Sequence, residues 1–125
     1  TQLISYLQNH NAYICGSSIT SIAKALASKT GWNSSTVACT VGFDPTANNS
    51  TGFGAVPAGN YYGSYYNFGD NAYYWSATEY SSTAAWNRYL NGGNAGVYSN
   101  SYGKENAFSV RCLRDRKRRG IFSLT

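Results

Sequence analysis

The residues best suited to chemistry lie between Asn60 and Asn106, where tyrosine, asparagine, serine and glycine predominate. Ten of the twelve tyrosines fall between Tyr61 and Tyr102. Tyrosine offers a large, stiff contact at low entropic cost, and Asn, Ser and Gly add adaptable hydrogen bonds. Adjacent pairs such as Tyr73-Tyr74 cannot both point into one core, so some of these rings must be exposed. The chemistry that this stretch predicts is non-covalent binding.

A low-complexity linker of the same composition is the alternative interpretation. Against it, large or charged residues are spaced through and beside the stretch in the manner of a fixed frame. Those frame residues are Phe53, Pro57, Phe68, Trp75, Glu79, Trp86, Arg88, Leu90, Val97 and Phe108. We therefore expect a folded surface in which polar and tyrosyl positions lie between scaffold positions.

Catalytic and metal-binding chemistry is not predicted. His10 is the only histidine, and no spacing pairs the acids Asp44, Asp70, Glu79, Glu105 and Asp115 for general acid and base work. The cysteines are Cys15, Cys39 and Cys112, with no CxxC or His/Cys metal spacing. The sequence leaves two alternatives open: one disulfide with one free thiol, or a cysteine bonded to a partner upstream of Thr1. We expect no catalytic residue, no metal and no cofactor.

The net charge of +5 is confined to one end of the chain. Up to Val110, four basic residues (Lys24, Lys29, Arg88, Lys104) balance four acids, so this part is formally neutral. The excess lies in Arg111, Arg114, Arg116, Lys117, Arg118 and Arg119. Nucleic-acid binding needs a basic face that follows phosphates, and a neutral body lacks one. We therefore expect no nucleic-acid partner, and no apolar run reaches the ~20 residues of a membrane span.

Hydrophobic periodicity predicts two helices followed by short strands. The first helix covers residues 1–7, and the second covers residues 19–27, with a cap at Ser17 or Ser18 and an end near Gly31. Strands are predicted at residues 72–76, 84–90, 95–98 and 108–113. The 125 residues suit one domain. The expected class is α+β, with residues 1–115 as the domain and residues 116–125 as a basic tail.

Five motifs in series make the sequence recognisable. They are Asn48 to Phe53, Val56 to Gly59, Tyr74 to Glu79, Ala85 to Arg88 and Phe108 to Cys112. Together they closely resemble the Fibrobacter succinogenes major paralogous domain. The resemblance implies a C-type-lectin-like (formylglycine-generating-enzyme-like) fold with two helices followed by a small, loop-rich antiparallel sheet. It also implies an extracellular location, on a bacterial cell surface or a phage virion.

Some members of that family are variable proteins of diversity-generating retroelements, in which template adenines are mutagenised. Asparagine codons altered at their adenines yield Tyr, Ser, Asp or Gly among others, which is the composition seen here. The resemblance thus implies ligand-facing, diversified positions between scaffold residues such as Trp75 and Trp86. Those positions are Tyr61, Tyr62, Tyr65, Asp70, Asn71, Tyr73, Tyr74, Tyr80, Asn87, Tyr89, Asn91, Asn94, Tyr98, Asn100, Tyr102 and Asn106.

The chain departs from the family pattern at its start. The family normally opens with a strand and a Gly-Trp-x-x-Pro segment, and neither is present. Either the chain is a fragment that lacks its N-terminal strand, or a second polypeptide supplies that strand. The motifs of calcium-dependent sugar-binding lectins and of copper-dependent formylglycine-generating enzymes are also missing.

These observations favour a non-enzymatic receptor or adhesin module that binds a protein or glycan on another cell or surface. One alternative is a structural domain of a bacterial surface lipoprotein or phage tail protein without an individual ligand. An enzyme of the formylglycine-generating type is a weaker third. For the binder, we expect replacement of Tyr73, Tyr74 and Tyr89 by alanine to abolish ligand binding while the melting temperature stays almost unchanged. We expect replacement of Trp75 or Trp86 to unfold the domain.

Overall fold

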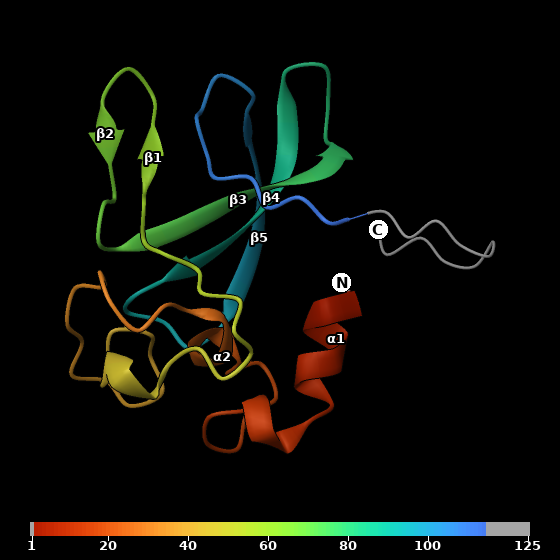
Figure 1. Ribbon diagram of the computed structural model, residues 1–125. Helices are drawn as coiled ribbons and strands as arrows, with labels where there is room; N and C mark the ends of the chain where they lie inside the picture. Colours follow the sequence, from red (N-terminus) through yellow and green to blue (C-terminus); the bar gives the residue numbers. More distant parts are fainter. Residues whose placement is uncertain (1, 115–125) are drawn as a thin grey trace.

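The computed structural model describes residues 2–114, and it shows helices at one end and antiparallel sheets above them (Figure 1). This confirms the coarse prediction of a small α+β fold in which the helices come first. The expected basic tail at residues 116–125 lies outside the described residues. Within residues 2–114, no helix has the length and apolar character needed to cross a membrane.

The first helix confirms its prediction, and the second is much shorter than predicted. Helix α1 covers Gln2–Gln8, whereas α2 covers only Ala23–Leu26. The backbone N–H of Ala23 donates to Ala95, and the backbone N–H of Ser28 donates to Ala55. These tertiary hydrogen bonds replace helical ones at both ends, so Ile19 is exposed and Gly31 is not a helix cap. Two short 3-10 turns, η1 (Asn11–Tyr13) and η2 (Pro45–Ala47), complete the helical elements.

Two separate antiparallel sheets follow. The smaller is a hairpin of β1 (Asn60–Tyr61) and β2 (Tyr65–Tyr66). The larger has the order β3-β4-β5, formed by β3 (Asn71–Glu79), β4 (Ala84–Asn91) and β5 (Val97–Gly103). Their Tyr, Trp, Thr and Val content suits a pleated, half-buried surface. The predictions at residues 72–76 and 84–90 are confirmed, and the third strand lies a few residues later than predicted.

The predicted strand at residues 108–113 is wrong, because residues 107–109 make only isolated bridges. Ala107 pairs with Tyr61, and Ser109 pairs with Tyr74 along the edge of β3 that faces away from β4. The backbone N–H of Ser109 donates to Tyr73, and that of Trp75 donates to Ser109. Since the segment divides its hydrogen bonds between the hairpin and β3, it does not form a regular ladder.

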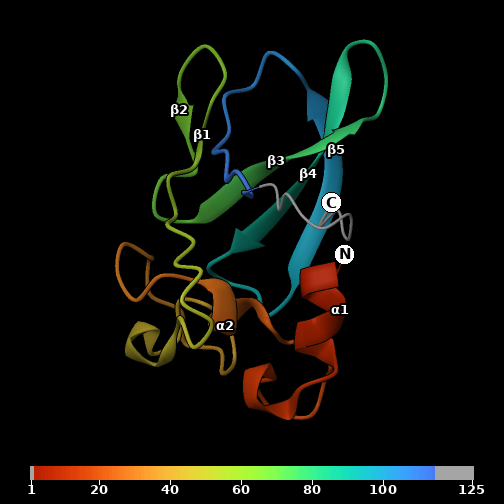
Figure 2. The same cartoon turned by 45° about the vertical axis from the view of Figure 1, so that its right-hand side comes forward.

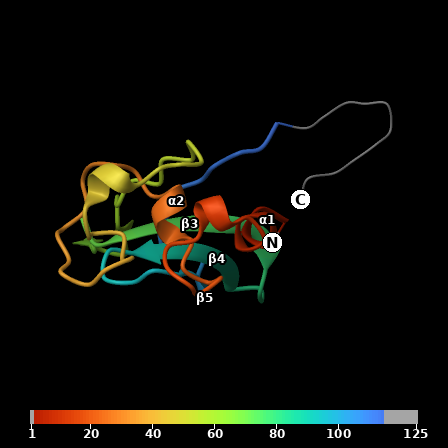
Figure 3. The ribbon, with the colours of Figure 1, turned by 90° about the horizontal axis from the view of Figure 1, so that it is seen from below.

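The core lies between α2, the long loop after it and one face of the larger sheet. Figure 3, seen from below, shows both helices in front of the strands. In the sheet, Ala72 pairs with Leu90 and Leu90 with Val97, so the three side chains share one face. This is the core face. The buried cluster consists of Leu7, Ile22, Ala23, Leu26, Ala27, Trp32, Val41, Ala55, Ala72 and Leu90, with Val97 packed against it.

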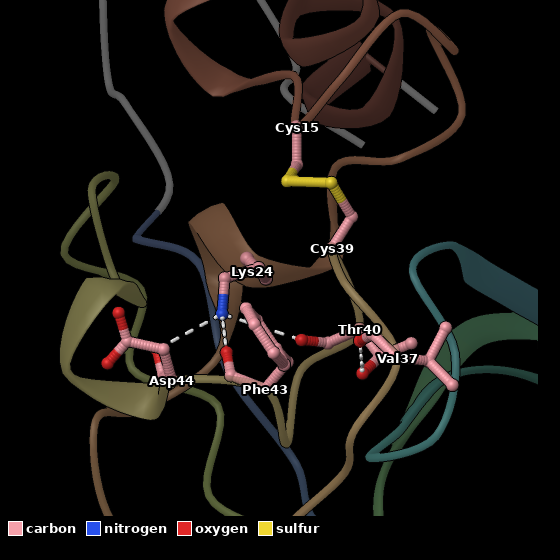
Figure 4. Close-up of a disulfide and its surroundings, with 7 residues drawn as sticks. All are labelled: Cys15, Lys24, Val37, Cys39, Thr40, Phe43 and Asp44. Atoms are coloured by element: carbon pink, nitrogen blue, oxygen red, sulfur yellow. Dashed lines mark hydrogen bonds between the residues drawn. A yellow bond between two sulfur atoms is a disulfide. The ribbon is translucent and has the colours of Figure 1, made fainter.

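The loop between α2 and β1 is fixed by a disulfide and by a lysine (Figure 4). Cys15 and Cys39 are bonded, and Cys112 is free and exposed. The Lys24 ammonium donates to the backbone carbonyls of Phe43, Asp44 at 3.2 Å and Thr40 at 3.4 Å. Burial lowers the pKa of Lys24, and the Asp44 carboxylate partly opposes that shift. The disulfide and the ammonium therefore fasten the loop at residues 39–44 to the helical end of the domain.

Candidate functional site

The face of the larger sheet opposite the core carries most of its tyrosines. Tyr73 in β3 pairs with Tyr89 in β4, and Tyr89 pairs with Tyr98 in β5, so the three rings form one row. Tyr102 lies on the same side, four residues farther along β5, because side chains alternate along a strand. We call Tyr73, Tyr89, Tyr98 and Tyr102 the tyrosine face.

Asparagines occupy the rows on either side of the tyrosines. The Nδ2 of Asn91 donates to Oδ1 of Asn71 at 2.7 Å, and the Nδ2 of Asn71 donates to the Tyr73 hydroxyl at 2.7 Å. In the next row, the Nδ2 of Asn87 donates to the Asn100 backbone carbonyl at 3.1 Å. Asn71 and Asn87 are buried, whereas Asn100 is exposed. These amides fix the rings from within the sheet and leave other polar groups at its surface.

Phe108 covers the β3 side of the tyrosine face. Its ring stacks on Tyr73 with centroids 4.7 Å apart and lies 4.4 Å from the ring of Trp75. Tyr73 is therefore only 7% exposed, whereas Tyr98 on β5 is 39% exposed. Tyr89 connects the two, at 5.4 Å from Tyr73 and 5.6 Å from Tyr98. The face thus grades from a covered side around Phe108, which also contacts Tyr102 of β5 at 5.7 Å, to an open end at Tyr98.

Burial changes the ionisation of these phenols. It raises the pKa of Tyr73, and the hydrogen bond from Asn71 partly opposes the shift, while Tyr102 and Tyr89 add to it. Burial likewise raises the pKa of Tyr89, with smaller contributions from Tyr102 and Tyr98. A phenolate in this cluster would be poorly solvated and would face other phenols. The hydroxyls of Tyr73 and Tyr89 therefore stay neutral and keep their capacity to donate and accept hydrogen bonds.

A second group of tyrosines projects from the β1–β2 hairpin. Tyr61, Tyr62, Tyr65 and Tyr66 are all exposed, and Tyr65 reaches 82%. We call these four residues the tyrosine hairpin. Figures 1 and 2 show this hairpin, the β3–β4 turn and the loop after β5 projecting from the end of the domain opposite the helices. The Tyr61–Ala107 bridge joins the hairpin to the segment that carries Phe108, so the hairpin backbone lies beside the covered side of the tyrosine face.

The structure brings half of the sequence-predicted ligand positions together on one sheet surface. The four members of the tyrosine face share it with Asn71, Asn87, Asn91 and Asn100. By exposure, the predicted set divides into three groups. Exposed are Tyr61, Tyr62, Tyr65, Asp70, Tyr80, Asn94, Tyr98 and Asn100; half-buried are Tyr74, Tyr89, Asn91, Tyr102 and Asn106; buried are Asn71, Tyr73 and Asn87.

Four predicted positions lie apart from that surface. Tyr74 is on the core face, with its ring 5.6 Å from Phe53. Tyr80 packs edge-on against Trp86 near the β3–β4 turn. Asp70 accepts a hydrogen bond from Asn33, and Asn94 lies in the turn before β5. Spacing along the chain did not indicate these differences, because they follow from strand alternation and turn position.

Three sequence-based expectations require correction. Tyr73 is buried and Tyr74 packs against the core, so alanine at either position should destabilise the domain. Trp86, expected to be a buried scaffold residue, is 36% exposed because its side chain lies past the end of the core cluster. Phe68, expected to belong to the fixed frame, is 78% exposed beside the tyrosine hairpin. Tyr66 was not among the predicted ligand positions although it is exposed, and the adjacent Tyr65-Tyr66 pair was the signal that could have indicated it.

The groups that could serve catalysis are dispersed. Among residues 2–114, no three His, Cys, Asp or Glu side chains converge to hold a metal ion. His10 stacks on Tyr6 with ring centroids 3.9 Å apart, in the helical part of the chain. Glu79 forms an ion pair with Lys104, and both side chains are largely exposed. Within the described residues, the arrangement offers aromatic surface and hydrogen-bonding groups.

Fold and site define a small α+β module with an aromatic, amide-rich surface at one end. The Fibrobacter succinogenes major domain family matches residues 2–114. The chain belongs to this family, which confirms the family resemblance seen in the sequence. No curated protein and no solved structure matches the chain.

Proposed function

We propose that this chain is a non-enzymatic binding module, a receptor or adhesin domain for a protein or glycan on another cell or surface. The ligand contacts the open edge of the tyrosine face together with the tyrosine hairpin. The observation that carries this proposal is the pairing of two aromatic groups. The exposed hairpin rings Tyr61 and Tyr65 form one group, the contacting rings Phe108, Tyr73, Tyr89 and Tyr98 form the other, and the Tyr61–Ala107 bridge joins their backbones.

The exposure of these rings is costly unless they serve contact with a partner. Contiguous exposed aromatic patches mark interaction sites, and tyrosine is enriched among the residues that dominate interface energy. Neighbouring amides support polar recognition as well: the Nδ2 of Asn67 donates to Asn60 at 3.0 Å, and Asn60 lies 3.4 Å from the side chain of Asn106. A rigid aromatic base with polar groups at its border suits a protein epitope or a glycan.

We infer the finer fold and the location from the family. We propose a C-type-lectin-like arrangement, with the helices and disulfide-bonded loop as the base and the hairpins as the binding end. The Cys15–Cys39 disulfide supports an extracellular position on a bacterial surface or a phage virion, because disulfides persist in oxidising compartments.

We also propose that the accessible positions are diversified by a retroelement. The burial pattern refines which positions vary freely. Asn71 and Asn87 are buried and hydrogen-bonded, so changes there cost stability, whereas Tyr62, Tyr65 and Tyr98 are exposed. The test is the neighbouring DNA. An Asn-rich template repeat beside a reverse transcriptase gene supports diversification, and the absence of both contradicts it.

A glycan and protein array probed with the purified chain tests the binding function. We expect saturable binding to a small set of ligands. A double variant, Tyr65→Ala with Tyr98→Ala, should lose that binding while it keeps the wild-type melting temperature. No binding above background across both arrays would favour the alternative of a structural domain without an individual ligand.

A further inference from the structure

A hollow of about 270 Å³ lies on the core face of the larger sheet, beyond the end of the apolar core. Arg88 pairs with Tyr74 and Ser99, and Trp86 lies two residues before Arg88 in β4, so Arg88, Ser99 and Trp86 share this face. Ser76, Thr78 and Asn87 complete the lining. None of the residues that give the hollow its charge, hydroxyls or ring belongs to the tyrosine face.

One wall of the hollow is an aromatic plane. The Trp86 ring is partly exposed, and Tyr80 packs edge-on against it with centroids 5.2 Å apart. Tyr80 thereby restricts the orientation of the indole. A supported, partly exposed indole is a flat apolar platform on which a ring with C–H groups can stack.

Among the described residues, the cation in the hollow has no counter-ion. Arg88 is half-buried, yet within residues 2–114 it takes part in no ion pair and its guanidinium in no hydrogen bond. Glu79, at the end of the neighbouring strand β3, is already paired with Lys104. A planar guanidinium matches a carboxylate through two parallel hydrogen bonds, and it is the preferred side chain for this purpose. The hollow is therefore suited to an anionic group.

Hydroxyl groups surround the cation. Ser99 is the cross-strand partner of Arg88 in β5, and Ser76 and Thr78 lie on β3 at its irregular end. The Oγ of Ser76 accepts from the Thr78 backbone N–H at 3.1 Å, which leaves the hydroxyl proton of Ser76 free to donate. Neutral hydroxyls beside a guanidinium suit a ligand that carries its own hydroxyls as well as its charge.

We propose that this hollow binds one acidic sugar residue, a pyranose ring that carries a carboxylate. The sugar ring stacks on Trp86, its carboxylate pairs with Arg88, and its hydroxyls exchange hydrogen bonds with Ser76, Thr78 and Ser99. The volume lies just below the ~300–1,000 Å³ of pockets for drug-sized ligands, so a single ring fits better than an oligosaccharide. This site is separate from the proposed binding function of the tyrosine face.

An NMR titration of the full chain tests the proposal with three probes. Methyl glucuronide carries the ring and the charge, methyl glucoside carries the ring alone, and acetate carries the charge alone. We expect saturable millimolar binding of the glucuronide, with shifts at the Trp86 indole N–H and the backbone of Arg88 and Ser99. The glucoside should bind at least about tenfold more weakly, and acetate should not saturate.

Variants assign the interaction to named side chains. Arg88→Gln should weaken glucuronide binding at least about tenfold and remove the preference over the glucoside, and Arg88→Lys should restore part of that preference. Trp86→Ala should weaken the glucuronide and the glucoside together. Tyr98→Ala, on the opposite face of the sheet, is the matched control and should leave all three titrations unchanged.

Three results would overturn the proposal. The first is equal affinity of the wild-type chain for glucuronide and glucoside. The second is acetate binding as tight as that of the glucuronide, which would indicate a simple anion site. The third is the absence of saturable shifts around Trp86. All three are read from the wild-type chain, so the test holds even where a variant fails to fold. Loss of glucuronide binding in Tyr98→Ala would instead place the sugar on the tyrosine face.

Discussion

The two faces of the β3-β4-β5 sheet use the same strands for opposite purposes. On the core face, Ala72, Leu90 and Val97 form a row of small aliphatic side chains against the helices. One residue along each strand, Tyr73, Tyr89 and Tyr98 form a row of rings on the other face. Strand alternation alone separates the two chemistries. The aliphatic row stabilises the sheet, and the stable sheet then holds the tyrosine row in fixed positions.

The tyrosine face itself has a covered part and an open part. Phe108 covers Tyr73, so the β3 edge behaves as a second, aromatic core. At β5, Tyr102 also contacts Phe108, and only the end at Tyr98 remains open. Tyrosines of one row therefore contribute differently: the covered ring stabilises the fold, and the open ring is accessible to a ligand. Replacing them one at a time should distinguish a loss of stability from a loss of binding.

The largest expected effect is that of Tyr73→Ala. Removal of this buried ring leaves a cavity beneath Phe108 and deprives Asn71 of its hydroxyl acceptor. We expect the free energy of unfolding to fall by about 3–5 kcal/mol, measured by urea denaturation. A loss below about 1 kcal/mol would show that the β3 edge is not a second core.

Leu90→Ala should have the next largest effect. Leu90 is buried in the core cluster between Ala72 and Val97, so its truncation costs transfer free energy and leaves a cavity. We expect a loss of about 3 kcal/mol in the same denaturation experiment. If Leu90→Ala lowered the free energy of unfolding far less than Tyr73→Ala, the principal core would lie on the aromatic face of the sheet and not on the aliphatic face.

Tyr73→Phe should give a smaller, pH-dependent effect. Burial raises the folded-state pKa of Tyr73 above its ordinary value of 10.0. Its contribution to stability is thus fully present below about pH 10 and is lost as the pH rises through the folded value. The phenylalanine variant should lose about 1 kcal/mol at pH 7 with the hydrogen bond from Asn71. Above about pH 10 its unfolding free energy should fall less steeply than that of the wild type.

The stability of the wild type and of Tyr73→Phe at alkaline pH could also contradict the burial of Tyr73. Parallel stability curves for the wild type and Tyr73→Phe from about pH 8 to pH 12 would mean that Tyr73 titrates alike in both states. The covered edge of the tyrosine face would then be open to water.

The smallest expected stability change is that of Tyr98→Ala. Its ring is partly exposed and contacts Tyr89 at the open edge. We expect the free energy of unfolding, measured by urea denaturation, to change by no more than about 0.5 kcal/mol, as for other surface substitutions. A loss comparable to that of Tyr73→Ala would remove the distinction between covered and open edges.

The sequence was sufficient for the class of fold, the family and strands β3 and β4. The Tyr-Trp-Ser-Ala-Thr and Ala-Trp-Asn-Arg segments have strand propensity and lie in β3 and β4. The length of α2 was not predictable, because distant carbonyls at Ala95 and Ala55 take the hydrogen bonds that would have extended the helix. The Cys15–Cys39 pairing was open for a similar reason, since spacing does not bring two thiols together.

The candidate site was predicted by composition and only partly by position. Composition alone predicts the same role for Tyr73, Tyr74 and Tyr89. In the structure, strand alternation places Tyr74 on the core face, and Phe108 covers Tyr73. Register in the larger sheet decides both outcomes, and a pattern of single residues does not contain the register. The exposure of Phe68 and Trp86 was missed because large apolar residues are usually buried.

The affinity of one array-identified ligand for three chains tests the central claim most directly. The chains are the wild type, the Tyr65→Ala/Tyr98→Ala double variant and the Arg88→Gln control, each with its urea midpoint measured. We expect the double variant to bind at least about tenfold more weakly at an unchanged midpoint, and Arg88→Gln to bind as the wild type does. Equal affinity of the double variant and the wild type would contradict the assignment of binding to the tyrosine face and hairpin.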